Sequence, residues 1–215
     1  MSVQDPAVVY ADDTLLVLDK PSGLLAVPGR GADKQDCLSA RVQARYPDAL
    51  IVHRLDMATS GLMVMARGPT AQRALSMAFA ARAVTKRYVA VVAGRLEPPA
   101  ATWGVIDLPI LVDWPNRPLR IIDHQAGKPS LTRWRVLGYE DCGQATRVEL
   151  EPVTGRSHQL RVHLRELGHP ILGDALYAPP EVGRMAARLQ LHAWSMRFAH
   201  PLTGSVLAFE CPAPF

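Results

Sequence analysis

Residues 53–61, His-Arg-Leu-Asp-Met-Ala-Thr-Ser-Gly, run directly into residues 62–66, Leu-Met-Val-Met-Ala. The continuous apolar run is typical of a strand that is covered on both faces. If residues 53–56 are extended, Arg54 and Asp56 share one face and His53 and Leu55 the other. We expect residues 59–61 to form a turn. Asp56 should therefore lie where a loop meets a buried strand.

Asp56 has two interpretations. Aspartate is common in turns because its side chain bonds the nearby backbone, and this is the ordinary explanation of a single aspartate. The neighbours favour a functional carboxylate, since an arginine precedes it, small hydroxylated residues follow it, and a buried strand would anchor the loop. Local sequence leaves both interpretations open.

The length of 215 residues and an apolar content of 48% are sufficient for a substantial core. Because no flexible linker, repeat or low-complexity run divides the sequence, we predict a single domain over residues 1–215. No apolar run is long enough to cross a membrane. The N-terminus lacks the basic and hydrophobic regions of a signal peptide, so we expect a cytoplasmic protein.

Cysteine and histidine spacing predicts neither disulfides nor a metal site. Cys37, Cys142 and Cys211 are an odd number without a close pair, which suits a reducing compartment. His158 and His163 are five residues apart, about 140° around a helix, whereas a chelating pair is spaced by three or four residues.

The net charge of +4 favours a polyanionic partner, although a cluster of charges is often only a solvated face. Most of the clustered cations are arginine, which binds phosphate oxygens bidentately and stacks on bases. The clusters comprise Arg82, Lys86 and Arg87; Arg117 and Arg120; Arg133 and Arg135; and Arg156, Arg161 and Arg165.

Hydrophobic periodicity predicts many strands and few helices. We expect helices over residues 36–45, 69–82 and 154–168. In the last of these, Ser157 would be the N-cap and Gly168 the stop, with His158, Arg161 and Arg165 on the polar face. Strands are expected in residues 8–20 (two, joined at 12–13), 62–66, 85–94, 102–107, 120–124, 131–139, 146–153, 189–198 and 205–210.

Two of these segments carry further expectations. In strand 146–153 charged residues alternate with apolar ones, so one face should be wet, as antiparallel sheets permit. Residues 113–118, Asp-Trp-Pro-Asn-Arg-Pro, should form a stiff loop with an exposed tryptophan and arginine. That loop could serve packing, or it could be a platform for a nucleic-acid base.

Three stretches together resemble the RluA family of pseudouridine synthases: residues 53–61, residues 86–94 (Lys-Arg-Tyr-Val-Ala-Val-Val-Ala-Gly) and residues 151–163 (Glu-Pro-Val-Thr-Gly-Arg-Ser-His-Gln-Leu-Arg-Val-His). They occur in the family's order, and residues 168–174 complete the pattern. The resemblance implies an α+β fold with a mixed, mainly antiparallel sheet, flanking helices and a central cleft. Many relatives begin with a separate S4-like RNA-binding domain, for which there is no room before these motifs.

The resemblance also implies a chemistry. Pseudouridine formation breaks the N1–C1′ bond of uridine and joins C5 to C1′, which needs no cofactor and no metal. Asp56 would attack C1′ or remove a sugar proton, with Arg161 as its cationic partner. Tyr88 would stack under the uracil.

RNA binding would fall to the catalytic domain itself. Arg54 would occupy the space that a flipped base vacates, and His53, Lys86, Arg87, Arg156 and Arg165 would contact RNA. The resemblance points to a uridine in a tRNA anticodon loop and one in a 23S rRNA loop, acted on by a monomer. Two alternatives use the same residues: a nucleoside or base-excision glycosidase, and a non-catalytic RNA-binding protein of ribosome assembly.

Overall fold

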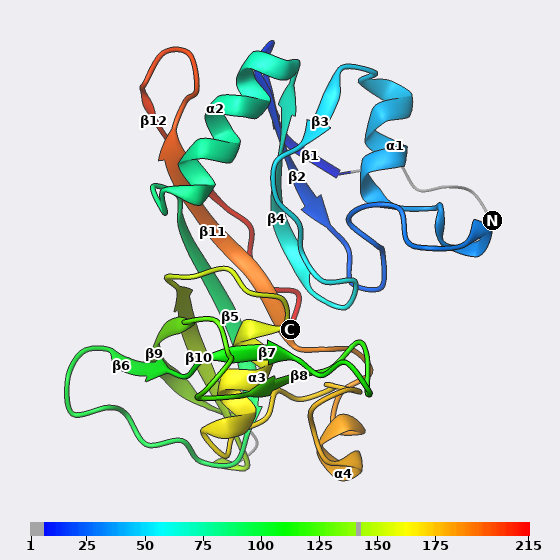
Figure 1. Cartoon of the computed structure of the whole chain (residues 1–215). Helices are drawn as coiled ribbons and strands as arrows, with labels where there is room; N and C mark the ends of the chain where they lie inside the picture. Colours follow the sequence, from blue (N-terminus) through cyan, green and yellow to red (C-terminus); the bar gives the residue numbers. More distant parts are fainter. Residues whose placement is uncertain (1–6, 141–142) are drawn as a thin grey trace. The chain divides into compact units, whose positions relative to one another are not determined.

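A computed structural model describes residues 7–140 and 143–215 (Figure 1). The chain forms two compact units, the first comprising the chain up to Lys86 with His192–Pro214, and the second Arg87–Leu191 with Phe215. The assignment of one catalytic domain stays a prediction. Cys37 and Cys211 are free thiols, whereas Cys142 lies outside the described residues.

Both units combine a sheet with short helices. The elements of the first unit are β1 (Ala7–Ala11), β2 (Leu15–Lys20), the 3₁₀ turn η1 (Ala32–Lys34), α1 (Leu38–Arg45), β3 (Ala49–Ile51), β4 (Ser60–Arg67), α2 (Pro69–Ala80), nearly all of β11 (Leu191–Ala199), and β12 (Val206–Glu210). Those of the second unit are most of β5 (Thr85–Ala93), then β6 (Gly104–Asp107), β7 (Ile110–Val112), β8 (Arg120–Ile122), β9 (Leu131–Glu140), β10 (Ala145–Pro152), α3 (Gln159–Glu166) and α4 (Pro180–Gly183).

Strand β4 is the centre of the first unit. The sheet runs β1-β2-β4-β11, with β3 paired to β4 and β12 to β11. Residues 60–66 of β4 are all buried, as the apolar run predicts, and the helix α2 packs Ala71 and Leu75 into the same core. The β4–β11 pair is parallel, whereas the pairs β1–β2, β2–β4, β3–β4 and β11–β12 are antiparallel. The predicted α+β class with a mixed, mainly antiparallel sheet is confirmed.

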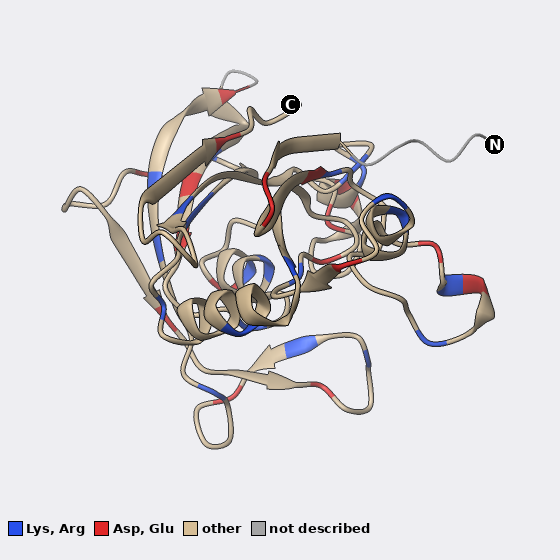
Figure 2. Cartoon of the chain, turned by 90° about the horizontal axis from the view of Figure 1, so that it is seen from above, with Lys and Arg blue, Asp and Glu red and all other residues tan. Residues whose placement is uncertain are grey.

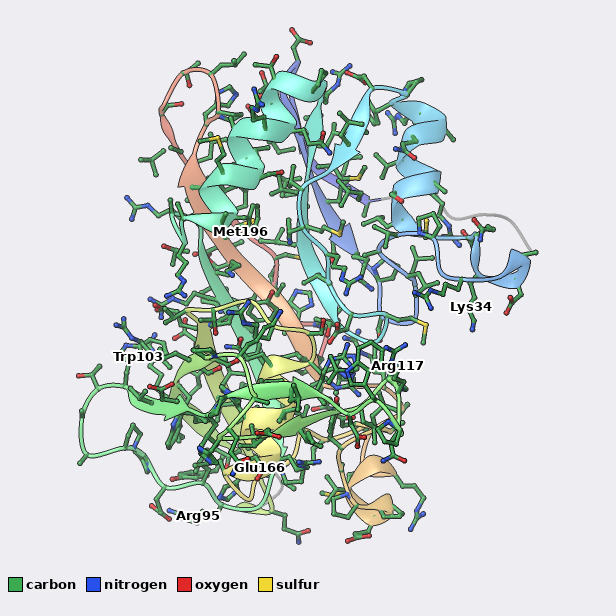
Figure 3. The ribbon with its side chains drawn as sticks, in the orientation of Figure 1. Lys34, Arg95, Trp103, Arg117, Glu166 and Met196 are labelled. Atoms are coloured by element: carbon green, nitrogen blue, oxygen red, sulfur yellow. The ribbon has the colours of Figure 1, made fainter. Side chains whose placement is uncertain are left out.

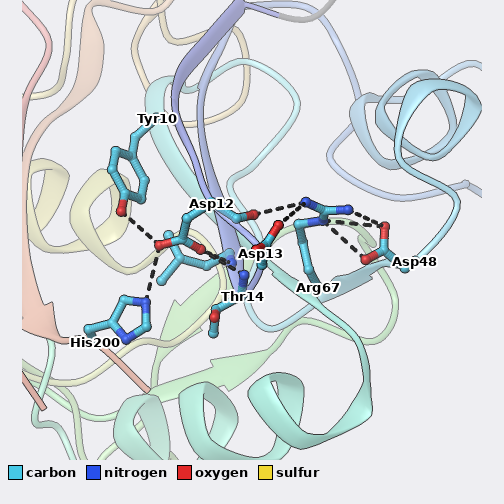
Figure 4. A network of polar contacts seen from close by, with 8 residues as sticks. Tyr10, Asp12, Asp13, Thr14, Asp48, Arg67 and His200 are labelled. Carbon is cyan, nitrogen blue, oxygen red and sulfur yellow. Dashed lines mark hydrogen bonds and ion pairs between the residues drawn. The ribbon is translucent and has the colours of Figure 1, made fainter. Parts of the chain in front are cut away.

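A polar network fastens the strand ends of this unit (Figure 4). The hydroxyl of Tyr10 donates to the Asp12 carboxylate at 2.7 Å, and Nε2 of His200 donates to the same carboxylate at 3.1 Å. Arg67, at the end of β4, binds the Asp48 carboxylate and the carbonyl of Asp12. The network therefore joins the β1–β2 turn to the β11–β12 turn and to β4.

Within the second unit the strands β5, β10, β9 and β6 pair in this order and are antiparallel, and β7 and β8 form a separate hairpin. The helix α3 packs on β8, β9 and β10. Ile110 of the hairpin, Val162 of α3 and Tyr177 are buried together. Strands β3 and β7 were not predicted, because three residues are too few to show a hydrophobic period.

The predicted helix over residues 154–168 is wrong at its start. Its first helical residue is Gln159, and His158, at the N-cap position, has a left-handed φ of 59°. Ser157 does not cap the helix. Instead the side-chain oxygen of Gln159 accepts the Arg156 N–H at 3.0 Å and the Thr154 hydroxyl at 2.7 Å, which holds the chain in a turn. Gly168, with φ of 86°, ends the helix as expected.

Two smaller expectations are also wrong. Ser60 and Gly61 already belong to β4, and the turn lies at residues 57–58, closed by the Thr59 N–H donating to the Asp56 carbonyl at 3.1 Å. The charged face of β10 is not fully wet. Glu149 is only 3% exposed because Arg135 binds its carboxylate, with Arg87 at 3.7 Å on the other side.

Gly61 is a position where this fold depends on glycine. Its φ is 108°, and an added Cβ would lie 2.3 Å from the backbone oxygen of Ala193 on β11. Gly61→Ala should lower the free energy of unfolding by about 3 kcal/mol or more, since left-handed strain and a backbone clash combine. Gly138→Ala in β9 is the matched control, because nothing lies within 4 Å of its added Cβ. Equal stabilities of the two variants in denaturant titrations would contradict this assignment.

Candidate active site

The loop that carries Asp56 is held by a buried ammonium group. Lys20 is fully buried, and its Nζ donates to the carbonyls of Pro21 at 2.8 Å, Leu24 at 2.7 Å and Met57 at 3.1 Å. Charge-assisted bonds to carbonyls offset the large cost of burying a cation. The peptide that follows Asp56 is therefore fixed by a side chain from the end of β2.

The turn after Lys20 supports the same loop. The Gly23 N–H donates to the Met57 carbonyl at 2.8 Å, and the Ser22 hydroxyl donates to the Ala58 carbonyl at 2.7 Å. Two consecutive peptides beyond Asp56 are thus held by residues 20–23. Sequence reasoning used these residues only as part of a resemblance and missed this clamp.

Exposure around Asp56 follows the alternation that the sequence predicts. Leu55 is buried, with 6% of its surface exposed, whereas Arg54 before it is exposed and Asp56 after it is half-buried. Arg54 and the carboxylate of Asp56 therefore come from the more open side of the segment, and Leu55 anchors it.

The side chain of His53 packs within the first unit. Its Nε2 accepts the backbone N–H of Val64 at 2.9 Å, and its ring stacks on Phe79 with centroids 4.3 Å apart. Burial, helped by the charge of Lys86, lowers the pKa of His53 to about 3. The imidazole is therefore neutral at physiological pH. Lys86 is itself half-buried, and burial lowers the pKa of its ammonium group.

In the second unit, Arg161 forms a buried bidentate pair with Asp174. Nε binds Oδ2 at 2.8 Å and Nη2 binds Oδ1 at 2.6 Å, with the two side chains 5% and 1% exposed. The placement of Arg161 on the polar face of its helix is therefore wrong. Asp174 also accepts the N–H groups of Leu176 and Tyr177, so it fixes a turn and an arginine at once. Sequence reasoning gave Asp174 no role, although it ends the motif of residues 168–174.

Tyr177 connects the start of α3 to the β7–β8 hairpin. Its hydroxyl accepts the backbone N–H of Arg120 at 2.9 Å and lies 2.6 Å from Nδ1 of His158. The guanidinium of Arg161 lies over the Tyr177 ring at 4.9 Å.

The other candidate RNA-binding residues of this unit differ in their exposure and in their contacts within the protein. Arg87 binds Glu151 at 2.8 Å and lies 4.6 Å over the ring of Trp103, which Figure 3 labels. Arg165 binds the adjacent Glu166, and Arg156 is exposed. Tyr88 is half-buried at the point where β5 enters the core. Basic and acidic residues are interspersed along the ribbon (Figure 2).

Among the described residues, Asp19, His192 and Cys211 form a group with the spacing of metal ligands, their ligand atoms lying within 4.8 Å of one another. The two ring nitrogens of His192 meet the Ser60 hydroxyl at 2.8 Å and the Cys211 carbonyl at 2.9 Å. Burial and the neighbouring Asp19 raise the pKa of the Cys211 thiol to about 11.

Comparison with known proteins identifies the family. The sequence profile described as RNA pseudouridylate synthase matches residues 14–166, which include the Lys20 clamp, Asp56 and Arg161. The chain belongs to the RNA pseudouridylate synthase family. The family resemblance and the enzyme class are therefore confirmed, and the activity is the isomerisation of uridine to pseudouridine in RNA.

Individual similar proteins are also named as pseudouridine synthases. The Dual-specificity RNA pseudouridine synthase RluA of Yersinia pestis is 49% identical over 208 residues, covering 97% of this chain and 99% of the relative. The protein of the same name from Escherichia coli K12 is 48% identical over 214 residues, covering 99% and 96%. The structure of Human RNA Pseudouridylate Synthase Domain Containing 1 has a TM-score of 0.81 and 30% identity, covering 100% of this chain and 86% of that one. None of the described helices of this pseudouridine synthase is long and apolar enough to cross a bilayer.

The depressed pKa of His53 predicts a pH-dependent stability. The unfolded chain binds a proton at His53 below about pH 6.5, whereas the folded protein does so only near 3, so acid favours unfolding. Between pH 6.5 and 4 the free energy of unfolding should fall by up to about 1.4 kcal/mol per pH unit from this residue. His53→Gln should flatten that dependence, and His124→Gln, at an exposed histidine, should not. Identical pH profiles of wild type and His53→Gln in denaturant titrations would refute the assignment.

Proposed function

We propose that Asp56 is the carboxylate that acts on the ribose of the target uridine. The observation that carries this proposal is the clamp of residues 20–23 on the peptides just beyond Asp56, which fixes the backbone of a half-buried carboxylate. Such fixation matters because catalysis depends on holding a reactive group in a near-attack geometry.

The chemistry needs an ionised carboxylate. In one route Asp56 attacks C1′ as the N1–C1′ bond breaks; in the other it removes a sugar proton and a glycal forms. In both, the detached base turns, C5 joins C1′, and the proton leaving C5 is replaced by one gained at N1, so the composition of the RNA is unchanged. A cationic partner favours the charged form of a carboxylate, and we assign this role to Arg161.

Asp174 supports the role of Arg161. The bidentate pair leaves Arg161 little rotational freedom, and the ring of Tyr177 lies under its guanidinium. We assign to Tyr88 the stacking contact with the uracil, since it stands where β5 turns from charged to apolar. A phenol at such a boundary offers an aromatic face and a hydroxyl.

The substrate proposed is a uridine that must be turned out of a structured RNA, at a cost of a few kcal/mol. Relatives named as dual-specificity enzymes support two substrate classes, which we propose to be a tRNA anticodon loop and a 23S rRNA loop. Exposed Arg54 would fill the space left by the base. A monomeric state and a cytoplasmic location remain predictions from the sequence.

Asp56→Ala should abolish pseudouridine formation while RNA affinity stays within a few-fold of wild type, because the substitution removes the reacting group and not the phosphate contacts. Asp33→Ala, at an exposed aspartate of η1, is the matched control and should keep full activity. The measurement is pseudouridine mapping of tRNA and 23S rRNA after incubation with each purified protein, together with RNA binding.

The products separate the alternatives. Release of free uracil would replace this proposal with a glycosidase, since an isomerase leaves the mass of the RNA unchanged. Pseudouridine formed at the wild-type rate by Asp56→Ala would remove Asp56 from the mechanism. RNA binding without any change of the RNA would favour the non-catalytic alternative.

The predicted RNA contacts of Arg156 and Arg165 are tested by salt dependence. Each substitution by alanine should weaken RNA binding and reduce the slope of log K against log salt by about one unit per lost phosphate contact. Arg95→Ala is the control, because Arg95 is exposed, binds Glu97 and is assigned no RNA contact. Slopes that do not change for Arg156→Ala and Arg165→Ala would exclude these phosphate contacts.

A further inference from the structure

The loop between β7 and β8 presents an aromatic side chain to solvent. Trp114 is 66% exposed, whereas Trp134 is 7% exposed and Trp103 and Trp194 are half-buried. The guanidinium of Arg117, a residue labelled in Figure 3, lies 3.3 Å from the centroid of the Trp114 ring. One face of the indole is thus covered by a cation, and most of the side chain remains in water.

The loop is stiffened by its own hydrogen bonds. The Asp113 carboxylate accepts the Asn116 backbone N–H at 3.3 Å and its side-chain amide at 3.1 Å. Backbone bonds link Asp113 to Leu119 and Leu119 to Asn116, and the Arg120 guanidinium donates to the carbonyls of Pro118 and Leu119. Trp114 therefore sits on a preformed turn, which lowers the entropy lost when a ligand binds it.

The same loop is anchored to the helix of the catalytic motif. The backbone N–H of Arg120 donates to the Tyr177 hydroxyl, and Leu119 and Ile122 pack against the cluster that contains Val162 of α3. The helix α3 also carries Arg161 and Arg165, whose guanidinium groups lie 4.9 Å and 5.6 Å from the centroid of the Tyr177 ring, so the loop that carries Trp114 and these arginines contact the same tyrosine.

We propose that Trp114, backed by Arg117, is a stacking platform for an unpaired base of the RNA substrate, separate from the uridine that is isomerised. The inference rests on the proposed RNA substrate and adds a recognition element to it. A planar indole with a guanidinium on one face offers its other face to a base, and Arg117 brings a positive charge near the phosphates. Stacking accepts every base, so the platform recognises single-stranded loops and not a particular sequence.

The test compares two substitutions on two RNA probes. The probes are a fluorescently labelled synthetic RNA stem-loop with unpaired loop bases and a fully paired RNA duplex of equal length. Trp114→Leu should weaken binding of the stem-loop roughly 5- to 100-fold, whereas Trp114→Phe, which retains an aromatic face, should keep most of the affinity. Binding of the duplex should be unchanged for both. Leu202→Ala, at a side chain 67% exposed in the first unit, is the matched control and should change neither affinity.

Three results would overturn the proposal: equal affinities of Trp114→Leu and Trp114→Phe for the stem-loop, an equal loss on the duplex, or no loss at all. Circular dichroism and thermal unfolding of each variant establish that it is folded. Because binding is measured without turnover, the outcome is independent of the role of Asp56. If the Trp114 substitutions weaken binding as predicted but the wild-type protein forms no pseudouridine, the proposed function is contradicted and the stacking platform is still supported.

Discussion

A buried ammonium group, that of Lys20, is the interaction on which the Asp56 loop depends. Burying a cation is unfavourable unless its hydrogen-bond donors have acceptors. The buried ammonium group of Lys20 donates to the carbonyls of three different residues. Two of these carbonyls belong to the turn after β2 and the third to the residue after Asp56. Closing the turn around the ammonium therefore also fixes the peptide between Met57 and Ala58, just beyond the candidate catalytic carboxylate. Removing the charge would take this donor away from the Pro21 and Leu24 carbonyls and leave the Met57 carbonyl with only the Gly23 N–H.

The second unit also contains a buried charged group that fixes a turn. Asp174 neutralises Arg161 in a buried pair and also caps the turn that presents Tyr177. The phenol of Tyr177 then reaches both the backbone of β8 and the side chain of His158. In each unit a buried charge thus fixes the backbone near a candidate site residue, Asp56 in the first unit and Arg161 in the second. A buried pair of this kind is worth more for orientation than for stability, because desolvation offsets most of its attraction.

The sequence predicted the fold where hydrophobic periods are long. Strand β4, helix α2 and strand β5 could be recognised because apolar runs or stripes of five or more residues mark them. The start of α3 could not, since the side chain of Gln159 binds the Arg156 N–H and the Thr154 hydroxyl and holds the preceding residues in a turn. Strands β3 and β7 are set by tertiary pairing and not by local pattern. The motif around Asp56 was visible, but its support from Lys20 was not, because the two lie far apart in sequence. Burial of Arg161 was missed for a similar reason, as its partner Asp174 lies thirteen residues away on a turn.

The central claim is that Asp56 acts on the sugar of a uridine turned out of structured RNA. The most direct measurement is a crystal structure of the Asp56→Asn variant bound to an RNA stem-loop that contains a target uridine. The account predicts that this uridine is extruded from the loop, with C1′ or a neighbouring sugar atom about 3–3.5 Å from the side chain of residue 56. A target uridine that remains stacked in the loop, or whose sugar lies against another carboxylate, would contradict it.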